Sequence, residues 1–342
     1  MWSRTFRFAP TSPRASVRRT SASCSTPARA STVRSMILAR KRPAVRPCRQ
    51  NCAALGVPAG FQQANQQISV QTGGNINLQP ETSDTFTFGF AYNPSWASNG
   101  WISELTFDAN YYDIELEDPI QALNAQAQLA NCVATLAPLF CGGITRASNG
   151  EIIAFANQLT NIGRIETDGY DLTITLTSEP TAAGTFRFLW SGTYLDNYEE
   201  FTQGLGSLVS TQRAGTEVGS PTRGFVRFKS SLNADWTLGS FTTSVSLRYL
   251  SALDEICPDN SIVGLCDNPT ANSNELGDRT YTDLQVSWSP PALDNKAQVT
   301  IGVSNLFNKE PPLCRSCDAS SFDGTIYPIG GRFLRARASM KF

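Results

Sequence analysis

The chain has 342 residues, of which 41% are hydrophobic, and a formal net charge of −1 at pH 7. It contains no apolar run of about 18 residues, which excludes a helical membrane span. Histidine is absent, so the chain lacks the commonest general base and metal ligand. We therefore expect a protein that is not an enzyme, with no catalytic residue, cofactor or metal site.

Residues 1–47 form a basic segment rich in Arg, Ser and Pro. Residues 1–50 hold 12 of the 28 Lys and Arg residues and no acid, and the first acidic residue is Glu81. This composition fits an organelle transit peptide, a nucleic-acid-binding arm or a stretch translated out of frame. The abrupt change near Pro47 and the lack of an apolar signal core favour the last. We expect residues 1–47 to be disordered and the protein to bind no nucleic acid.

From residue 82 onward, apolar and polar side chains alternate with a period of two between turn residues, which is the pattern of β-strands. Phe86, Phe88 and Phe90 begin the pattern on one face. The alternation predicts nine strands, centred on residues 86–92, 105–116, 170–176, 186–194, 226–236, 241–249, 284–288, 299–303 and 330–342. Most can extend to about ten residues, the length with which a tilted strand crosses a bilayer.

The links between these strands alternate between short and long. The short links are residues 94–100, 179–184, 238–240 and 290–295, and the long ones are residues 117–163, 199–222, 252–278 and 308–330. Short periplasmic turns and long extracellular loops are typical of outer-membrane barrels. Trp96, Trp101, Trp236 and Trp288 lie beside short links, where an aromatic girdle would meet the inner membrane interface.

The last strand has an apolar and a cationic face. Its apolar face comprises Leu334, Ala336, Ala338, Met340 and Phe342, and the opposite face comprises Phe333, Arg335, Arg337, Ser339 and Lys341. Such a strand fits a barrel with lipid outside and a wet lumen inside. Alternation also fits a soluble β-sandwich, whose apolar faces meet a second sheet. The alternation of short and long links, together with the strand lengths, favours the barrel over the sandwich. We therefore expect an all-β fold, an incomplete antiparallel transmembrane β-barrel of about nine strands.

Eight of the nine cysteines form near pairs. These are Cys48 with Cys52, Cys132 with Cys141, Cys257 with Cys266, and Cys314 with Cys317. All occur in, or just before, segments that strand counting places outside the cell, so the spacing predicts loop disulfides. The Cys314–Cys317 stretch also fits a redox or zinc motif, but it follows no βαβ unit and has no histidine nearby.

Two further loop features carry predictions. Asp118 and Pro119 are residue types that begin helices, so we expect a short helix from there to about Thr135. In the second long loop, the aromatic and acidic residues Tyr198, Glu199, Glu200 and Phe201 fit a ligand-contacting role. Solvated loop side chains are the better interpretation of these residues.

Several segments occur in a familiar order and spacing. They are residues 112–118, 140–141, 144–146, 150–152, 161–163, 167–172 and 303–309, and the Gly331-Arg332 strand that ends in Phe342. The most specific are this last strand and the segment containing Asn305, Leu306 and Phe307. Together they resemble the C-terminal part of the β-barrel of TonB-dependent outer-membrane receptors. The resemblance covers residues 48–342, and residues 51–56 suggest that the true reading frame begins near Cys48.

The resemblance implies energised uptake of a scarce ligand, such as a siderophore–iron complex, cobalamin or an oligosaccharide, across a Gram-negative outer membrane. The implied partners are membrane lipid, the barrel assembly machinery through the C-terminal strand, and the TonB complex in a full-length form only. Barrels of this transporter type have 22 strands. We therefore expect an inactive fragment without plug or early strands. The rival functions are a passive outer-membrane pore and a soluble β-sandwich that binds carbohydrate.

Overall fold

The computed structural model describes residues 15–16 and 46–340, apart from 64–67, 99, 124, 162, 204–207, 220–221, 257–272, 294–295 and 318–320. Most of the basic segment 1–47 thus lies outside the described residues, and its disorder stays a prediction. The helices are α1 (Arg46–Ala54), α2 (Ala125–Thr135) and α3 (Pro138–Cys141), with 3-10 turns η1 (Ser95–Ser98) and η2 (Pro291–Leu293). Among these residues, every helix is too short or too polar to cross a membrane.

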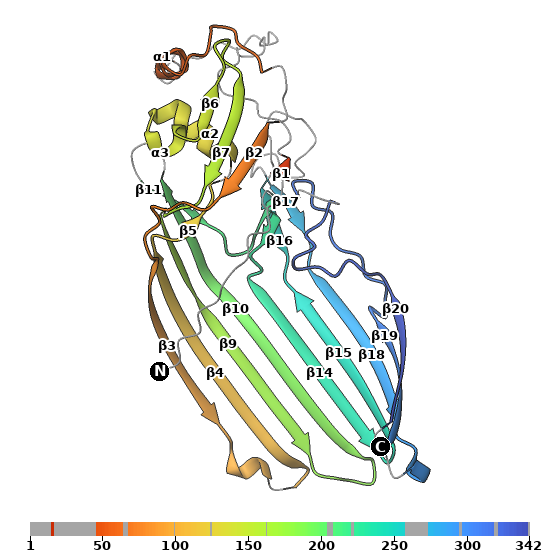
Figure 1. The fold of residues 1–342 in the computed structure, drawn as a ribbon. Coiled ribbons are helices and arrows are strands. Elements are labelled where there is room, and N and C mark those ends of the chain that lie inside the picture. Colours follow the sequence, from red (N-terminus) through yellow and green to blue (C-terminus); the bar gives the residue numbers. More distant parts are fainter. Residues whose placement is uncertain are drawn as a thin grey trace, which may run out of the picture. The chain divides into compact units, whose positions relative to one another are not determined.

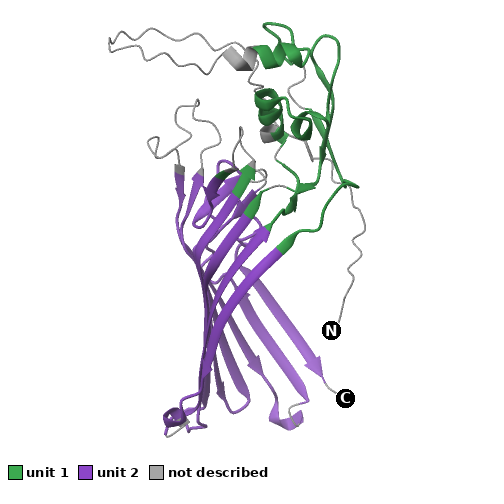
Figure 2. Cartoon of the chain, turned by 90° about the vertical axis from the view of Figure 1, so that its left-hand side faces the viewer, with its two compact units in different colours: residues 1–82, 117–164, 201–209 green, residues 83–116, 165–200, 210–342 purple. Residues whose placement is uncertain are grey.

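The chain divides into two compact units (Figure 2). Unit 1 comprises residues 1–82, 117–164 and 201–209, and unit 2 comprises residues 83–116, 165–200 and 210–342. Unit 2 holds nearly all of the large sheet, and unit 1 holds the first long loop with the segment that precedes the sheet.

The nine predicted strands are confirmed as one continuous sheet. Their order is β3-β4-β9-β10-β14-β15-β18-β19-β20, which is the order in which they occur along the chain (Figure 1). Their bounds are β3 Thr82–Tyr92, β4 Ile102–Glu117, β9 Arg164–Ser178, β10 Thr185–Gln203, β14 Phe228–Leu238, β15 Phe241–Leu250, β18 Arg279–Trp288, β19 Ala297–Ser304 and β20 Phe333–Met340. Each of the last five strands pairs antiparallel with the strand before it in this order.

The register gives the sheet one apolar and one polar face. Leu232 pairs with Leu247, and Val286 with Ile301, which places apolar rows on one side. The last strand follows the sequence pattern, since Leu334, Ala336, Ala338 and Met340 pair with Val303, Ile301, Val299 and Ala297. Lys341 and Phe342 lie outside the described residues. The apolar side is uncovered, with Ile301 61% and Leu334 70% exposed, whereas a sandwich would bury such side chains.

The sorting of the links is also as predicted. η1 joins β3 to β4, η2 joins β18 to β19, and short turns join β9 to β10 and β14 to β15, all at one end of the sheet (Figure 1). At this end lie the exposed rings of Trp96, Trp101, Trp236 and Trp288. Trp236 stacks on Phe186 at 6.4 Å between ring centroids and donates from Nε1 to the carbonyl of Ala183 at 2.8 Å. This arrangement is an aromatic girdle.

At the other end of unit 2, two of the long loops build a small sheet. Its order is β13-β12-β16-β17, with bounds β13 Thr222–Gly224, β12 Thr216–Gly219, β16 Leu253–Ile256 and β17 Ser273–Leu276. Leu253, Leu276 and Cys314 form its buried core, so the described part of the loop 308–330 packs against strands from the two loops before it. We call this assembly the loop layer. A further strand, β11 (Leu208–Gln212), pairs with β10.

Unit 1 contains a four-stranded sheet of order β1-β2-β7-β6, in which β2 and β7 run parallel. The bounds are β1 Ala15–Ser16, β2 Ser69–Gly73, β6 Ile144–Arg146 and β7 Ile152–Gln158. Val70 and Phe155 from the sheet and Leu129 and Val133 from α2 share one buried core. The first long loop is therefore a folded element.

The predicted start of the loop helix at Asp118 is wrong. Asp118 has a φ of +51°, and the next residues form β5 (Ile120–Gln121), which pairs with β8 (Thr160–Asn161). The backbone N–H of Ile120 also donates to Glu81 at 3.1 Å. Because these bonds hold the backbone extended, α2 begins only at Ala125; its end at Thr135 is as predicted.

Candidate functional site

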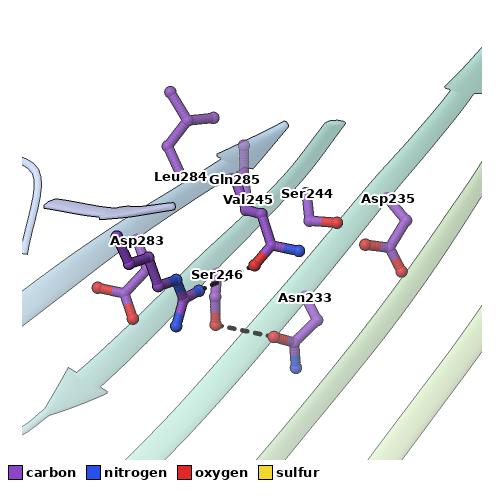
Figure 3. A pocket seen from close by; sticks show the side chains of 9 residues that line it. Asn233, Asp235, Ser244, Val245, Ser246, Asp283, Leu284 and Gln285 are labelled. Atoms are coloured by element: carbon purple, nitrogen blue, oxygen red, sulfur yellow. Dashed lines mark hydrogen bonds between the residues drawn. The ribbon is translucent and has the colours of Figure 1, made fainter. Parts of the chain in front are cut away.

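The polar face of the large sheet carries a pocket of about 210 Å³ (Figure 3). It is lined by Asn233, Asp235, Ser244, Val245, Ser246, Asp283, Leu284, Gln285 and Arg335. Alternation along β14, β15 and β18 puts the polar members on one side, because every second residue shares a face. Ser246 donates to Asn233 at 2.8 Å, and Arg335 donates to Gln285 at 3.0 Å. The pocket is a hydrogen-bonding surface of mixed charge.

Both signs of charge are matched across this face. Asp235 pairs across strands with Arg187. Asp283 accepts the backbone N–H of Asn305 at 2.7 Å and lies 3.9 Å from the guanidinium of Arg248. Polar groups that are already paired in this way suit a wet lumen, where side chains exchange partners with water at little cost.

A buried ion-pair cluster lies near the C-terminal end of β10, which contains Glu200. Glu200 is 7% exposed, with Arg213 Nε 2.8 Å from its Oε2 and Arg223 bonded to its Oε1. The Arg223 guanidinium lies 4.6 Å from the Phe225 ring centroid, and the Tyr198 ring is 4.5 Å from the same ring. The solvated interpretation of Glu200 is therefore wrong. Its partners lie 13 and 23 residues further along the chain, beyond any local sequence signal.

The signature residues Asn305, Leu306 and Phe307 form a turn after β19. Asn305 is 3% exposed; its Nδ2 donates to the carbonyl of Lys309 and its Oδ1 accepts the Lys309 N–H. The backbone N–H of Leu306 donates to the carbonyl of Thr282 at 2.7 Å, whereas the Phe307 ring is 71% exposed. The motif therefore fixes the exit of β19 against β18.

The start of the final strand is tied to the same turn. Asn308 Oδ1 accepts the backbone N–H of Arg332 at 2.8 Å. A Cβ at Gly331 would lie 2.8 Å from this oxygen, so a side chain there would displace it. Phe342, the remaining signature residue, lies outside the described residues. The Asn308 side chain thus holds the start of the final strand through the backbone of Arg332.

The structure joins Cys132 to Cys141 and Cys314 to Cys317 by disulfides. The first links α2 to α3, and the second closes a turn within the loop layer. Cys52 on α1 is buried and disulfide-bonded. The side chain of Cys48 and both Cys257 and Cys266 lie outside the described residues, so these pairings stay predictions.

The loop layer also buries three carboxyl groups, which the sequence pattern does not single out. Glu217 and Glu255 are 0% exposed and Asp323 is 1% exposed. Glu255 accepts the backbone N–H of Ser316 and, at 3.2 Å, an N–H of Asn274. Burial, reinforced by the charge of Asp323, raises the pKa of Glu217 to about 8. Burial, followed by the charge of Glu217, raises the pKa of Tyr327 to about 12.

A ligand atom of Glu217 lies within 4.8 Å of both sulfurs of the loop disulfide, a spacing that metal sites use. The sulfurs of Cys314 and Cys317 are bonded to each other, however, and a disulfide offers no thiolate. The disulfide state of this group therefore does not fit a zinc site.

A continuous sheet with an uncovered apolar face, a polar opposite face, an aromatic girdle and long loops at one end defines an outer-membrane β-barrel architecture. The family model "TonB dependent receptor-like, beta-barrel" matches residues 2–306. The chain belongs to this family, and its place is the outer membrane.

Three solved structures to which this chain is similar can be named. They are the FrpB iron transporter of Neisseria meningitidis (14% identity, TM-score 0.47, 80% of this chain and 33% of that chain), YddB of Escherichia coli (14%, 0.49, 81% and 35%) and a mutant of the ferric enterobactin receptor PfeA of Pseudomonas aeruginosa (17%, 0.49, 81% and 33%). The chain thus spans about a third of their length. No curated protein matches.

Proposed function

We propose that this chain forms the C-terminal part of the barrel of a receptor that takes up a scarce ligand with energy from the TonB complex. The family match supports the receptor type. The observation that carries the proposal is the two-faced sheet with long, folded loops at one end. The uptake ligand belongs to the class of siderophore–iron complexes, cobalamin or oligosaccharides. The chain is not an enzyme in this proposal.

The nine strands act only together with further strands and a plug. Barrels of this transporter type have 22 strands, and every described residue of the outer strands β3 and β20 is exposed. An unpaired backbone group in lipid costs several kcal/mol, so such edges are unstable there. The 342-residue chain alone therefore supports no transport. Its partners are lipid, the barrel assembly machinery at the C-terminal strand and, for the complete receptor, TonB.

Uptake in cells tests this function. A strain without its own receptors would receive either the chain with an export signal or a receptor with the plug and early strands restored. Each strain would be offered labelled ferric siderophores, cobalamin and maltooligosaccharides. We expect accumulation of one ligand class with the restored receptor only, and its loss when the tonB gene is deleted.

The matched control is the restored receptor in the tonB deletion strain. Accumulation that persists there would identify a passive pore and refute active uptake. Accumulation with the 342-residue chain alone would refute the need for further strands. Recovery of a folded, soluble protein from the periplasm would refute the membrane function altogether.

A further inference from the structure

We propose that Glu217 and Asp323 share one proton, and that this shared proton fastens the last long loop, residues 308–330, to the loop sheet. The result is a pH-sensitive latch within the loop layer. The latch is independent of which ligand the receptor carries, and its test needs no transport measurement.

The two carboxyl groups each have an oxygen without a donor. Oε2 of Glu217 and Oδ2 of Asp323 are both inaccessible to solvent and unpaired, although the other oxygen of Asp323 accepts the N–H and hydroxyl of Thr325. A buried, unsatisfied carboxylate oxygen costs at least as much as a lost hydrogen bond. A bound proton or a cation would stabilise these two buried carboxylate oxygens.

Asp323 acts on Glu217 through its charge and through a side-chain hydrogen bond, and both effects raise the pKa of Glu217. Two carboxylates cannot form a hydrogen bond between them, but a carboxylic acid can donate to a carboxylate. One proton between the pair therefore gives each side chain a hydrogen-bond partner and removes one of two like charges. A proton also needs no cavity, which suits a site from which solvent is excluded.

Besides Asp323, the charged side chain that acts on Glu217 is that of Glu255. β16 contributes Glu255, β13 contributes only the backbone N–H of Arg223, and the last loop contributes Tyr327 and the disulfide. Cys317 Sγ lies 3.8 Å from Glu217, but a disulfide sulfur has no proton to donate. Arg279 and Tyr281 of β18 act on Tyr327. Among the described residues, neither member of the pair has an ion pair with Lys or Arg.

The position of the pair makes it a latch between loops. Glu217 lies on β12, and Asp323 lies in the last loop, 106 positions further along the chain by the numbering. The Cys314–Cys317 disulfide lies wholly within the last loop, so it does not tie that loop to β12. The acid pair is thus a direct polar link between the two elements.

The pH dependence follows from linkage. Burial raises the pKa of Glu217 to about 8 in the closed layer, whereas an exposed Glu side chain has its ordinary pKa of about 4.5. The closed state therefore binds more protons between these values, and its stability falls as pH rises. The bound proton therefore stabilises the closed loop layer fully below about pH 4.5, and this stabilisation is lost above about pH 8.

Hydrogen exchange of the full chain in detergent tests the latch. The reporters are the amides of Cys314, Thr325 and Tyr327, which bond within the last loop. Their protection factors, corrected for intrinsic exchange, should fall about tenfold per pH unit between pH 5 and 8 and level off above. In Glu217→Gln, whose amide is neutral at every pH, protection should not change with pH.

The control is Glu275→Gln, an equivalent change at an exposed position of β17, which should keep the wild-type slope. A slope that survives Glu217→Gln, or wild-type protection that is flat from pH 5 to 8, would overturn the proposal. Restoration of protection by calcium chloride at pH 9 in the wild-type chain, but not in Glu217→Gln, would also overturn the proposal. A cation, and not a proton, would then bridge the two carboxylates.

A second measurement needs no folded variant. The infrared spectrum of the wild-type chain at pH 7 should contain the carbonyl band of a protonated carboxylic acid, and this band should disappear on titration through about pH 8. Absence of such a band from the folded chain at pH 7 would also refute the shared proton.

Discussion

Asn305 adopts a left-handed backbone conformation, with a φ of +51°, while its side chain closes two hydrogen bonds with Lys309. Asn tolerates this conformation better than most residues because its short polar side chain bonds locally. Asn305 is also buried, with only 3% of its surface exposed. One residue therefore sets both the backbone path and the polar contacts where β19 ends.

We expect Asn305→Ala to lower the free energy of unfolding by about 2–4 kcal/mol, because it strains the backbone and removes two hydrogen bonds. Asn305→Gly should cost roughly half as much, since glycine tolerates the positive φ. Urea unfolding of the restored receptor in detergent would measure both. Equal costs would mean that the backbone conformation contributes nothing.

Sequence reasoning found Asn305 as part of a motif but not the reason for its presence. A motif records which residue stands at a position, whereas the φ angle and the hydrogen bonds to Lys309 and Asp283 depend on the folded turn. Glu200 is a case in which no sequence motif marks a residue that is buried in the fold. It resembles any loop acid in sequence and proves to be a buried ion-pair partner of Arg213 and Arg223.

Within the single strand β15, successive residues alternate between the apolar and the polar face of the sheet. Leu247 pairs across strands with Leu232 on the apolar face. Its neighbour Arg248 lies on the polar face, 3.9 Å from Asp283 and over the ring of Tyr281. Because successive strand residues point to opposite sides, adjacent positions experience lipid and water.

We expect Leu247→Arg to destabilise the restored receptor by about 2–4 kcal/mol if the site lies at mid-bilayer, because a guanidinium would then face acyl chains. Arg248→Leu should be milder, at about 1 kcal/mol or less, since it removes a half-exposed ion pair. Denaturant titration of receptor folded into liposomes would compare them. Equal effects at the two positions would contradict the assigned faces.

The strands were predictable because their signal is local and repeated. An alternating pattern over ten residues averages over single exceptions, and cross-strand register then follows from the faces. The start of the loop helix rested on two residues, Asp118 and Pro119. This two-residue signal was overridden by strand pairing between β5 and β8, which lie about 40 residues apart in the sequence.

At the scale of the whole molecule, the large sheet has two open edges. Described residues of β3 and β20 are exposed along their full length. Open edges and an uncovered apolar face are the features that cause β-proteins to associate. In the complete barrel, further strands would cover the edges and lipid would cover the apolar face.

We therefore expect the 342-residue chain to aggregate in plain buffer and to stay dispersed in detergent, because micelles cover the apolar face. Size-exclusion chromatography with light scattering would measure this, and near-ultraviolet circular dichroism would report tertiary packing. A monodisperse monomer with native tertiary signals in plain buffer would contradict the membrane assignment.

The sequence by itself determined the nine long strands of the large sheet, their two faces and the sorting of the links, because each depends on residues next to one another along the chain. Only the tertiary structure decided that the described parts of the long loops form small sheets with buried cores, that Glu200 is buried in an ion pair, and that Glu217 and Asp323 are buried in the same loop layer. Those contacts join segments far apart in sequence, and the energy of a buried charge depends on which partners the fold brings to it.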